Sequence, residues 1–319
     1  MNDSILKQLE HNPVTQSILH SRDNVGNLYP MEEAMLLCAA FRADHKTRII
    51  VKKNRYEAMQ LYERILQIEE NTILFAMEES LRVQAIASSI EDREEQLNAL
   101  ITMISDPKPR LIVCNCAAFL RYLPSYDFMK ENIFHLSAGQ EMDMKQLKER
   151  LNRLGYSKVN YVDRPCSYAS RGGIVDVFCL GYEHPLRIEF FDTEIDSIRL
   201  INEQTQRTIE TKNECLITPA SDILFTDTQI EEIHTIVREK LVKEKEKLSE
   251  EEGEELQDHI EADLLSLQTY DPESHLYWYY SYVHSDQLLD YVDGEVILSS
   301  QEQVERAAKK LNEDNIAFI

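Results

Sequence analysis

The chain has 319 residues, enough for two or three domains that each have a hydrophobic core. Its 57 Asp and Glu residues outnumber its 34 Lys and Arg residues, and the formal net charge of -23 argues against tight autonomous binding to nucleic acid, because such a surface repels phosphate groups. No apolar run approaches the roughly 18 residues of a membrane span, and the amino terminus lacks a signal-peptide pattern, so we expect a cytoplasmic protein without a membrane partner.

The first 128 residues have the pattern of an α/β domain. A short apolar strand at residues 48–52 is followed by a helical pattern that Asn54 can cap. A second strand at 71–76, a helix over 91–104 and a third strand at 111–119 continue this pattern. Strands that alternate with helices predict a parallel sheet with helical crossovers.

A nucleotide site in such a sheet would need a Walker A loop, whose glycine-rich backbone and lysine hold the phosphates. The corresponding segment is residues 24–37, with the sequence NVGNLYPMEEAMLL. It contains one glycine, Gly26, and no lysine, while Glu32 and Glu33 place negative charge where a phosphate would bind. The chain contains no Gly-Lys dipeptide. We therefore expect no ATP or other cofactor in this chain.

The cysteines and histidines form none of the patterns that indicate a metal or catalytic site. The six cysteines include no Cys-x-x-Cys pair, and the histidines form no His-Glu-x-x-His motif. Cys114 and Cys116 are two residues apart in an apolar run, which predicts that they share one face of a buried strand. The sequence thus predicts neither a metal site nor a catalytic residue.

Residues 170–207 read as three short strands joined by turns. The segment 186–191 alternates, because successive side chains of a strand point to opposite faces. One face is apolar and predicts a core: Leu186, Ile188 and Phe190. The other face combines opposite charges with an aromatic ring and is typical of an interaction surface: Arg187, Glu189 and Phe191. The alternative is that Phe191 is one of the single exposed aromatics that carry no function.

The last third of the chain is predicted to be mostly helical. Residues 228–266 form a helical pair whose break is placed at Gly253, within a charged and solvated bend. The aromatic run at 276–283 predicts core packing in preference to stacking on single-stranded bases, because no basic residue is interleaved with it. A strand at 294–300, a helix and a short final strand near Ile316 are expected to return to the first sheet.

Several runs of residues occur in the order found in one known family. They are NRYEAMQLYERI, FAMEES, IVCNCAAFLRYLPS, LSAGQEMDMKQLKERLNRLGY, SRGGIVDVF, HPLRIEFFDTEIDSIR, TQRTIE and ITPASDIL. With these runs the chain resembles the amino-terminal region of the bacterial transcription-repair coupling factors, the Mfd family, whose first domains are similar to those of the excision-repair protein UvrB. The missing Walker A motif favours the coupling factors over UvrB.

The resemblance implies a fold of three parts. Residues 1–128 would be the first part of a degenerate helicase-like (RecA-like) α/β domain with a parallel sheet. Residues 129–214 would be an inserted α+β domain that carries a face for UvrA. Residues 215–319 would contribute a helical segment and the strands that complete the first domain.

The resemblance also implies a function. The chain would be a non-catalytic adaptor that recruits UvrA for transcription-coupled nucleotide excision repair, with the same face masked by the protein's own carboxy-terminal domain while the factor is inactive. The motor that uses ATP and Mg, and the parts that bind double-stranded DNA and RNA polymerase, would follow residue 319, so we expect the chain to be a piece of a longer protein. The alternative is a UvrB-like ATPase and DNA-binding subunit with an unconventional nucleotide site.

The family's contact residues for UvrA fall on Arg171, Arg187 and Phe191 of this sequence. Glu189 lies between the last two and is expected to fix the register or to pair with a neighbouring arginine. For Arg171 the alternative is a purely structural role in the turn beside Gly172 and Gly173.

Overall fold

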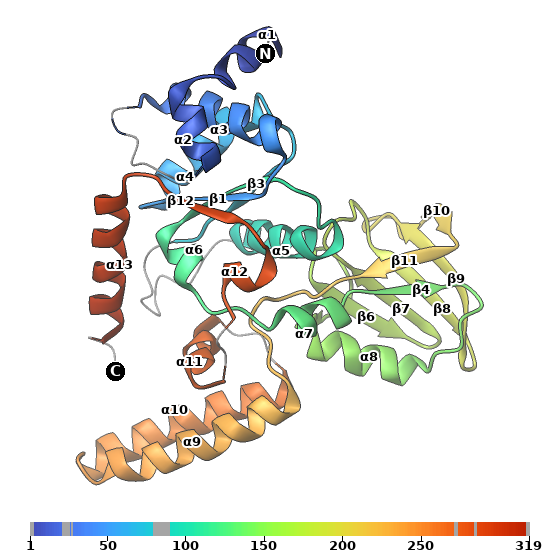
Figure 1. Cartoon of the computed structure of the whole chain (residues 1–319). Helices are drawn as coiled ribbons and strands as arrows, with labels where there is room; N and C mark the ends of the chain where they lie inside the picture. The colour runs from blue at the N-terminus through green and yellow to red at the C-terminus, as the bar shows by residue number, and fades with distance from the viewer. Residues whose placement is uncertain are drawn as a thin grey trace. The chain divides into compact units, whose positions relative to one another are not determined.

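The computed structural model describes residues 3–20, 26, 28–78, 90–270, 274–283 and 286–316. The chain forms two compact units, Met1–Arg121 with Gln287–Ile319, and Tyr122–Asp286 (Figure 1). Both contain helices and sheets, which confirms the predicted α/β class. The family boundaries placed at residues 128 and 214 stay predictions.

The first unit is built on a four-stranded parallel sheet with the order β12-β1-β3-β2. Its edge strand β12 comes from the predicted returning segment and pairs with β1, so that Arg48 lies opposite Glu295. The helix after β12 extends to Ile316, where a short strand was predicted, and residues 317–319 lie outside the described residues. The elements of this unit are α1 (Asp3–Leu9), α2 (Pro13–His20), α3 (Pro30–Asp44), β1 (Arg48–Lys52), α4 (Arg55–Leu66), β2 (Thr72–Phe75), α5 (Ile90–Ser105), β3 (Leu111–Asn115), α6 (Cys116–Leu120), α12 (Leu288–Tyr291), β12 (Glu295–Leu298) and α13 (Gln301–Ile316).

Helices cover this sheet on both faces (Figure 1). Strands β1 and β3 are buried along their whole length, as expected for parallel strands between two helical layers. Helices α3 and α4 pack on one face, where Leu37 and Leu61 join Ile50 and Val113 in a common core. The side chain of Asn54 accepts a hydrogen bond from the Glu57 amide at 2.8 Å, which confirms the predicted cap of α4.

The prediction that Cys114 and Cys116 share a strand face was wrong for Cys116. Strand β3 ends at Asn115, whose side chain accepts a hydrogen bond from the Ala118 amide and so begins α6 at Cys116. Both thiols are buried, and this burial raises their pKa values above the ordinary value of a thiol. A high pKa keeps a thiol protonated at neutral pH, so both cysteines are packing residues.

The second unit contains a six-stranded sheet with the order β10-β9-β8-β7-β6-β5. Its strands pair antiparallel, except for the short parallel pair of β5 and β6. Residues 170–207 contain three complete strands and the end of a fourth, because β6 begins before Ser170. The elements of this unit are α7 (Tyr126–Glu131), β4 (Phe134–Ser137), α8 (Met144–Arg153), β5 (Ser157–Lys158), β6 (Ser167–Arg171), β7 (Ile174–Phe178), β8 (Leu186–Phe191), β9 (Glu194–Ile201), β10 (Thr208–Lys212), β11 (Glu214–Ile217), α9 (Asp227–Lys245), α10 (Glu250–Thr269), η2 (Ser274–Tyr279) and α11 (Tyr280–Val283).

Helix α8 and the two-stranded sheet of β4 and β11 cover one face of the six-stranded sheet (Figure 1). Leu147 and Leu151 of α8 pack there against Val175 and Ile188 of the sheet. The chain enters and leaves this unit side by side, since the Leu123 amide donates to the Asp286 carbonyl at 2.9 Å. The opposite face of the sheet has no such layer of helices in the described part of the unit, and it carries polar side chains.

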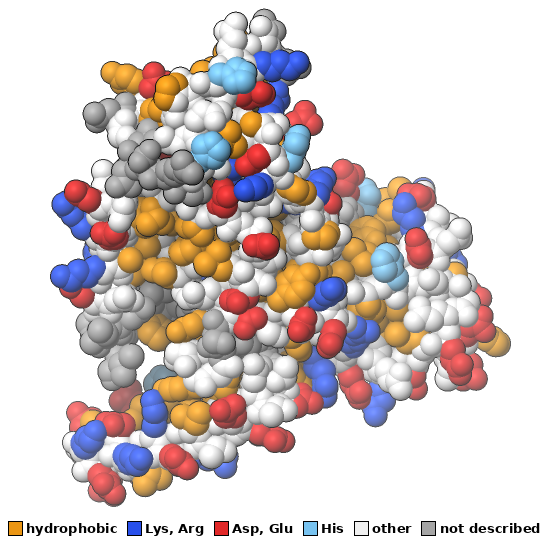
Figure 2. Space-filling model, in the orientation of Figure 1, with side chains coloured by type: hydrophobic (Ala, Val, Ile, Leu, Met, Phe, Trp, Pro, Cys, Tyr) orange, Lys and Arg blue, Asp and Glu red, His pale blue; other side chains and the backbone are white. Residues whose placement is uncertain are grey.

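The predicted break at Gly253 was wrong. The two helices of the pair are separated at residues 246–249, and Gly253 lies buried in the first turns of α10. Ser249 and Glu252 form a capping box, a stronger signal for a helix start than the glycine is for a break. Figure 2 shows acidic and basic side chains mixed over this pair, as is typical of a solvated surface. No helix of the described residues is long and apolar enough to cross a membrane.

The aromatic run packs as predicted. Leu276, Tyr279 and Tyr280 are buried together with residues of α9 and α10. The hydroxyl of Tyr280 also accepts a hydrogen bond from the Leu224 amide at 2.7 Å, which ties the run to the segment before α9. The aromatic run therefore forms the core of the helical part of the unit.

Candidate functional site: the open face of the six-stranded sheet

A row of charged side chains crosses the face of the sheet opposite α8. The register places Asp176 of β7 beside Arg187 of β8, and Arg187 beside Arg199 of β9. Arg187 donates two hydrogen bonds to Asp176, from Nε to Oδ1 at 2.7 Å and from Nη2 to Oδ2 at 2.8 Å. Its Nη2 also donates to Oε1 of Gln206 at 2.7 Å. Only 15% of the Arg187 side chain is exposed, and 4% of Asp176. Donation of these hydrogen bonds to the Asp176 carboxylate raises the pKa of Arg187 above its ordinary value.

Glu189 occupies the next outward position of β8. Its Oε2 accepts hydrogen bonds from Nη2 of Arg199 at 2.6 Å and from the hydroxyl of Ser197 at 3.0 Å. Glu189 therefore pairs with a neighbouring arginine, as the sequence predicted. These contacts fix β8 against β9.

Arg171 is the last residue of β6 and lies at the edge of this row. Its Nη2 is 3.5 Å from Oδ2 of Asp176, and its guanidinium carbon lies 4.9 Å from the centre of the Tyr161 ring. Unlike Arg187, it keeps 49% of its side chain exposed. Its contacts thus reach beyond the adjoining turn, to the next strand and to the segment before β6.

Two glycines follow Arg171 and form that turn. Gly172 has a φ of +56°, in the left-handed region that a side chain disfavours. A Cβ at Gly173 would lie 3.0 Å from the carbonyl oxygen of Phe190, so a side chain there would displace β8. The turn therefore requires glycine on both conformational and steric grounds.

Phe191 is the most exposed large side chain of this face, at 78%. It ends β8, and the turn that follows starts at Asp192 with a φ of 58°. Its neighbour Phe190 packs against the core, and the Phe190 amide donates to the Gly173 carbonyl at 2.8 Å. The predicted alternation of β8 is confirmed.

Arg171 and Phe191 lie at the same end of the sheet. Strand β7 runs antiparallel to both β6 and β8, and its first residue, Ile174, pairs with Arg171 on one side and with Glu189 on the other. The end of β6 and the end of β8 therefore flank the start of β7. We call the side chains of Arg171, Asp176, Arg187, Glu189 and Phe191 the open face.

Sequence reasoning did not name Asp176 of the open face, nor four residues that contact this face: Tyr161, Ser197, Arg199 and Gln206. Asp176 gave a signal, since it is a charged residue in the middle of the otherwise apolar strand IVDVF. Such a residue needs a partner when it is buried. Gln206 and Tyr161 lie outside the strands and gave no comparable signal.

The ligand-binding edge of a parallel sheet lies at the carboxyl ends of its strands. In the first unit, an internal ion pair lies at this edge. Lys52, the last residue of β1, donates to the Glu33 carboxylate at 2.7 and 2.9 Å and to the Ser299 hydroxyl at 2.6 Å. Asn24, Val25 and Asn27 of the segment searched for a Walker A loop lie outside the described residues.

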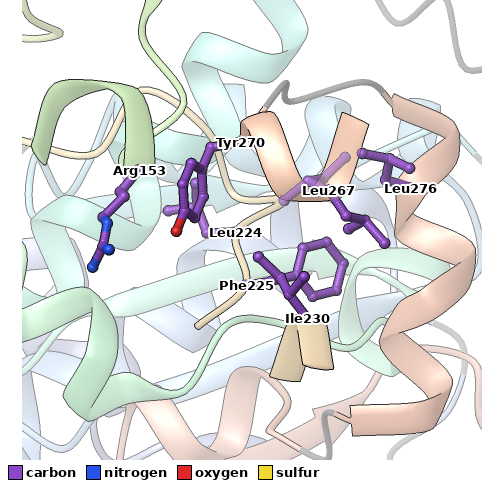
Figure 3. A pocket seen from close by; sticks show the side chains of 8 residues that line it. Arg153, Leu224, Phe225, Ile230, Leu267, Tyr270 and Leu276 are labelled. Carbon is purple, nitrogen blue, oxygen red and sulfur yellow. The ribbon is translucent and has the colours of Figure 1, made fainter. Parts of the chain in front are cut away.

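The described part of the structure contains two hollows. Figure 3 shows a pocket in the second unit, with Arg153 and Tyr270 at one end and apolar side chains at the other; its volume of about 20 Å³ is about that of one water molecule. An open depression of about 360 Å³ lies in the first unit at the amino ends of β2 and β3, near Thr72 and Arg110. The described residues include no group of three or more His, Cys, Asp or Glu side chains that could hold a metal ion.

A family model of known proteins matches the segment that forms the six-stranded sheet. Residues 134–225 match the model of the UvrB interaction domain. This segment runs from the start of β4 to the loop before α9 and therefore contains the open face.

Curated relatives extend the similarity to most of the chain. The transcription-repair-coupling factor of Bacillus subtilis (strain 168) is 28% identical over 285 residues, which are 86% of this chain and 24% of the relative. The factor of Staphylococcus aureus (strain bovine RF122 / ET3-1) is 24% identical over 301 residues, 92% of this chain and 26% of the relative. The chain spans about a quarter of the length of these relatives. The predicted resemblance to the coupling factors is confirmed.

Proposed function

We propose that this chain acts as the amino-terminal region of a transcription-repair coupling factor and binds UvrA through the open face. The proposal rests on one observation: the segment that matches the family model also contains the exposed aromatic residue. The match to the UvrB interaction domain covers the six-stranded sheet, and the same sheet exposes Phe191 at the end that also bears Arg171.

The chemistry of the open face supports a protein partner. An exposed aromatic ring that enters a pocket of a partner supplies a large share of local binding energy. Arg171 has a half-exposed guanidinium, which can form paired hydrogen bonds with a carboxylate. Arg187 and Glu189 are mostly occupied by contacts within the sheet and hold its shape.

The remaining roles rest on the resemblance to the coupling factors. In the intact protein the chain recruits UvrA for transcription-coupled nucleotide excision repair, and the protein's own carboxy-terminal domain masks the open face until the factor engages RNA polymerase. The ATP- and Mg-dependent motor, which moves on double-stranded DNA, lies in other parts of the protein. The chain itself has no catalytic residue and no cofactor, and it acts in the cytoplasm.

Calorimetric titration of the chain with UvrA tests the proposal. We expect saturable binding, and a loss of about 30-fold in affinity for Phe191→Ala, which corresponds to the roughly 2 kcal/mol of a typical anchor residue. Ile209→Ala is the matched control, because Ile209 is a half-exposed apolar residue on the edge strand β10. Absence of binding, or equal losses for both variants, would contradict the proposal.

Two further measurements test the masking of the open face and the non-catalytic role of the chain. The masking role predicts weaker UvrA binding by the full-length protein than by this chain, and equal affinities would exclude it. The non-catalytic role predicts no saturable binding in an ATP titration, since Glu33 already neutralises Lys52 at the ligand edge of the parallel sheet. Micromolar ATP binding would instead support the UvrB-like ATPase.

A further inference from the structure

Tyr161 is a large side chain that stays exposed although the backbone around it is held in place. Its side chain is 62% exposed, whereas the next residue, Val162, is buried with Ala169 and Phe178. The Val159 amide also donates to the Tyr168 carbonyl at 2.9 Å. The segment before β6 is thus anchored to the sheet on both sides of Tyr161, and the exposure of the ring follows from the fold.

The Tyr161 ring faces the guanidinium of Arg171. The distance of 4.9 Å from the guanidinium carbon to the ring centre lies within the range of cation–π interactions. On its other side Arg171 is 3.5 Å from Asp176. These two contacts restrain a long side chain that would otherwise lose its rotamer freedom on binding a partner.

The two arginines of the open face therefore have different roles. The Nε and Nη2 groups of Arg187 already donate hydrogen bonds to Asp176 and Gln206, and the side chain is mostly buried. Arg171 is half exposed, and its hydrogen bond to Asp176 is weak, at 3.5 Å. A partner carboxylate has access to Arg171.

We propose that Tyr161 is a further contact residue of the open face, and that Tyr161 and Arg171 act as one stacked pair that binds an acidic side chain of the partner. This inference rests on the proposed function. The row of charged side chains on the open face contains more arginines than carboxylates, which fits an acidic partner. The arginines are Arg171, Arg187 and Arg199, and the carboxylates are Asp176 and Glu189. The ring holds the guanidinium in place and adds its own apolar surface to the contact.

Three single variants test the inference by calorimetric titration with UvrA. Tyr161→Ala should weaken binding about tenfold, the effect of removing one stacked aromatic. Tyr161→Phe should bind within about twofold of the unchanged chain, because stacking needs the ring and not the hydroxyl. Tyr56→Ala is the matched control, since Tyr56 is 71% exposed in the other unit, and it should bind unchanged.

A double variant tests whether the two residues act as one pair. If Tyr161 and Arg171 act as a pair, the loss of binding free energy in the variant with both changed to Ala should be smaller than the sum of the two single losses, whereas losses that add would overturn the stacked pair. Normal binding by Tyr161→Ala, together with weak binding by Phe191→Ala, would overturn the inference and leave the proposed function intact. No UvrA binding by the unchanged chain would overturn both.

Discussion

The ion pair of Asp176 and Arg187 gives a sharp prediction about stability. Arg187→Met keeps an unbranched, apolar side chain on β8 but removes both hydrogen bonds to Asp176. The carboxylate would stay almost fully buried, with Arg171 at 3.5 Å as its remaining charged contact in the open face. Breaking a buried pair in this way costs about 3–5 kcal/mol. Because Arg171 can move towards Asp176, we expect the lower end, about 3 kcal/mol.

Urea unfolding at neutral pH, followed by circular dichroism and by the fluorescence of Trp278, measures this loss. Trp278 is the single tryptophan and lies in the same unit as the ion pair. The control is the double change of Asp176→Leu with Arg187→Met, which should recover most of the lost stability, since no charge is then left buried. A loss below about 0.5 kcal/mol for Arg187→Met would mean that water screens the pair, and the reasoning would be wrong.

Arg187 holds the sheet together as well as lying in the open face. A variant of Arg187 that no longer binds UvrA could have lost the shape of the open face, because Arg187 links β7, β8 and the loop that contains Gln206. Variants of Phe191 and Tyr161 change exposed side chains and report on contact. Binding studies should therefore rest on these residues.

Three further predictions concern stability outside the open face. The pKa of Asp44 is pushed up by burial but more strongly down by hydrogen bonds and charges, chiefly from Arg48, and it lies below its ordinary value. The stabilisation from Asp44 is thus present above about pH 4 and is lost as the pH falls through the lowered pKa, so Asp44→Asn should destabilise the chain at pH 7 and flatten the acid side of its stability profile in thermal unfolding. Glu33→Gln leaves the mostly buried Lys52 without its counter-charge and should cost about 2 kcal/mol in urea unfolding, and an unchanged midpoint would show that the pair contributes nothing. Gly253→Ala should stabilise the helical pair by about 0.5–1 kcal/mol, because the position is helical and the nearest atom to an added Cβ is 3.4 Å away; a lower melting temperature would refute this.

Local patterns predicted those parts of the site that depend on a single strand. The alternation of apolar and polar residues in β8 predicted which side chains from Leu186 to Phe191 face the core and which face outward. This prediction was possible because the direction of a side chain depends only on its position along the strand. The error at Gly253 has a local cause as well. The capping box of Ser249 and Glu252 starts the helix, and a helix tolerates a glycine at a cost of only about 1 kcal/mol.

The partners within the open face could not be predicted from such patterns. The contact of Asp176 with Arg187 depends on the register of β7 against β8, which joins residues eleven positions apart. The contact of Tyr161 with Arg171 depends on the path of a segment that has no regular structure between β5 and β6. Register and loop path are set by the packing of the whole unit, so they became visible only in the structure.

The pairing of β12 with β1 has a consequence for the order in which the nascent chain can fold. Strand β1 leaves the ribosome early, but the edge strand that completes its sheet follows only after the entire second unit has been made. At ordinary rates of translation the intervening 165 residues, Tyr122–Asp286, take roughly 10 to 30 seconds to synthesise. During this interval the second unit can fold by itself, whereas one edge of β1 stays without its partner strand. Chaperones that cover exposed strand edges would therefore act on the first unit while the second is being synthesised.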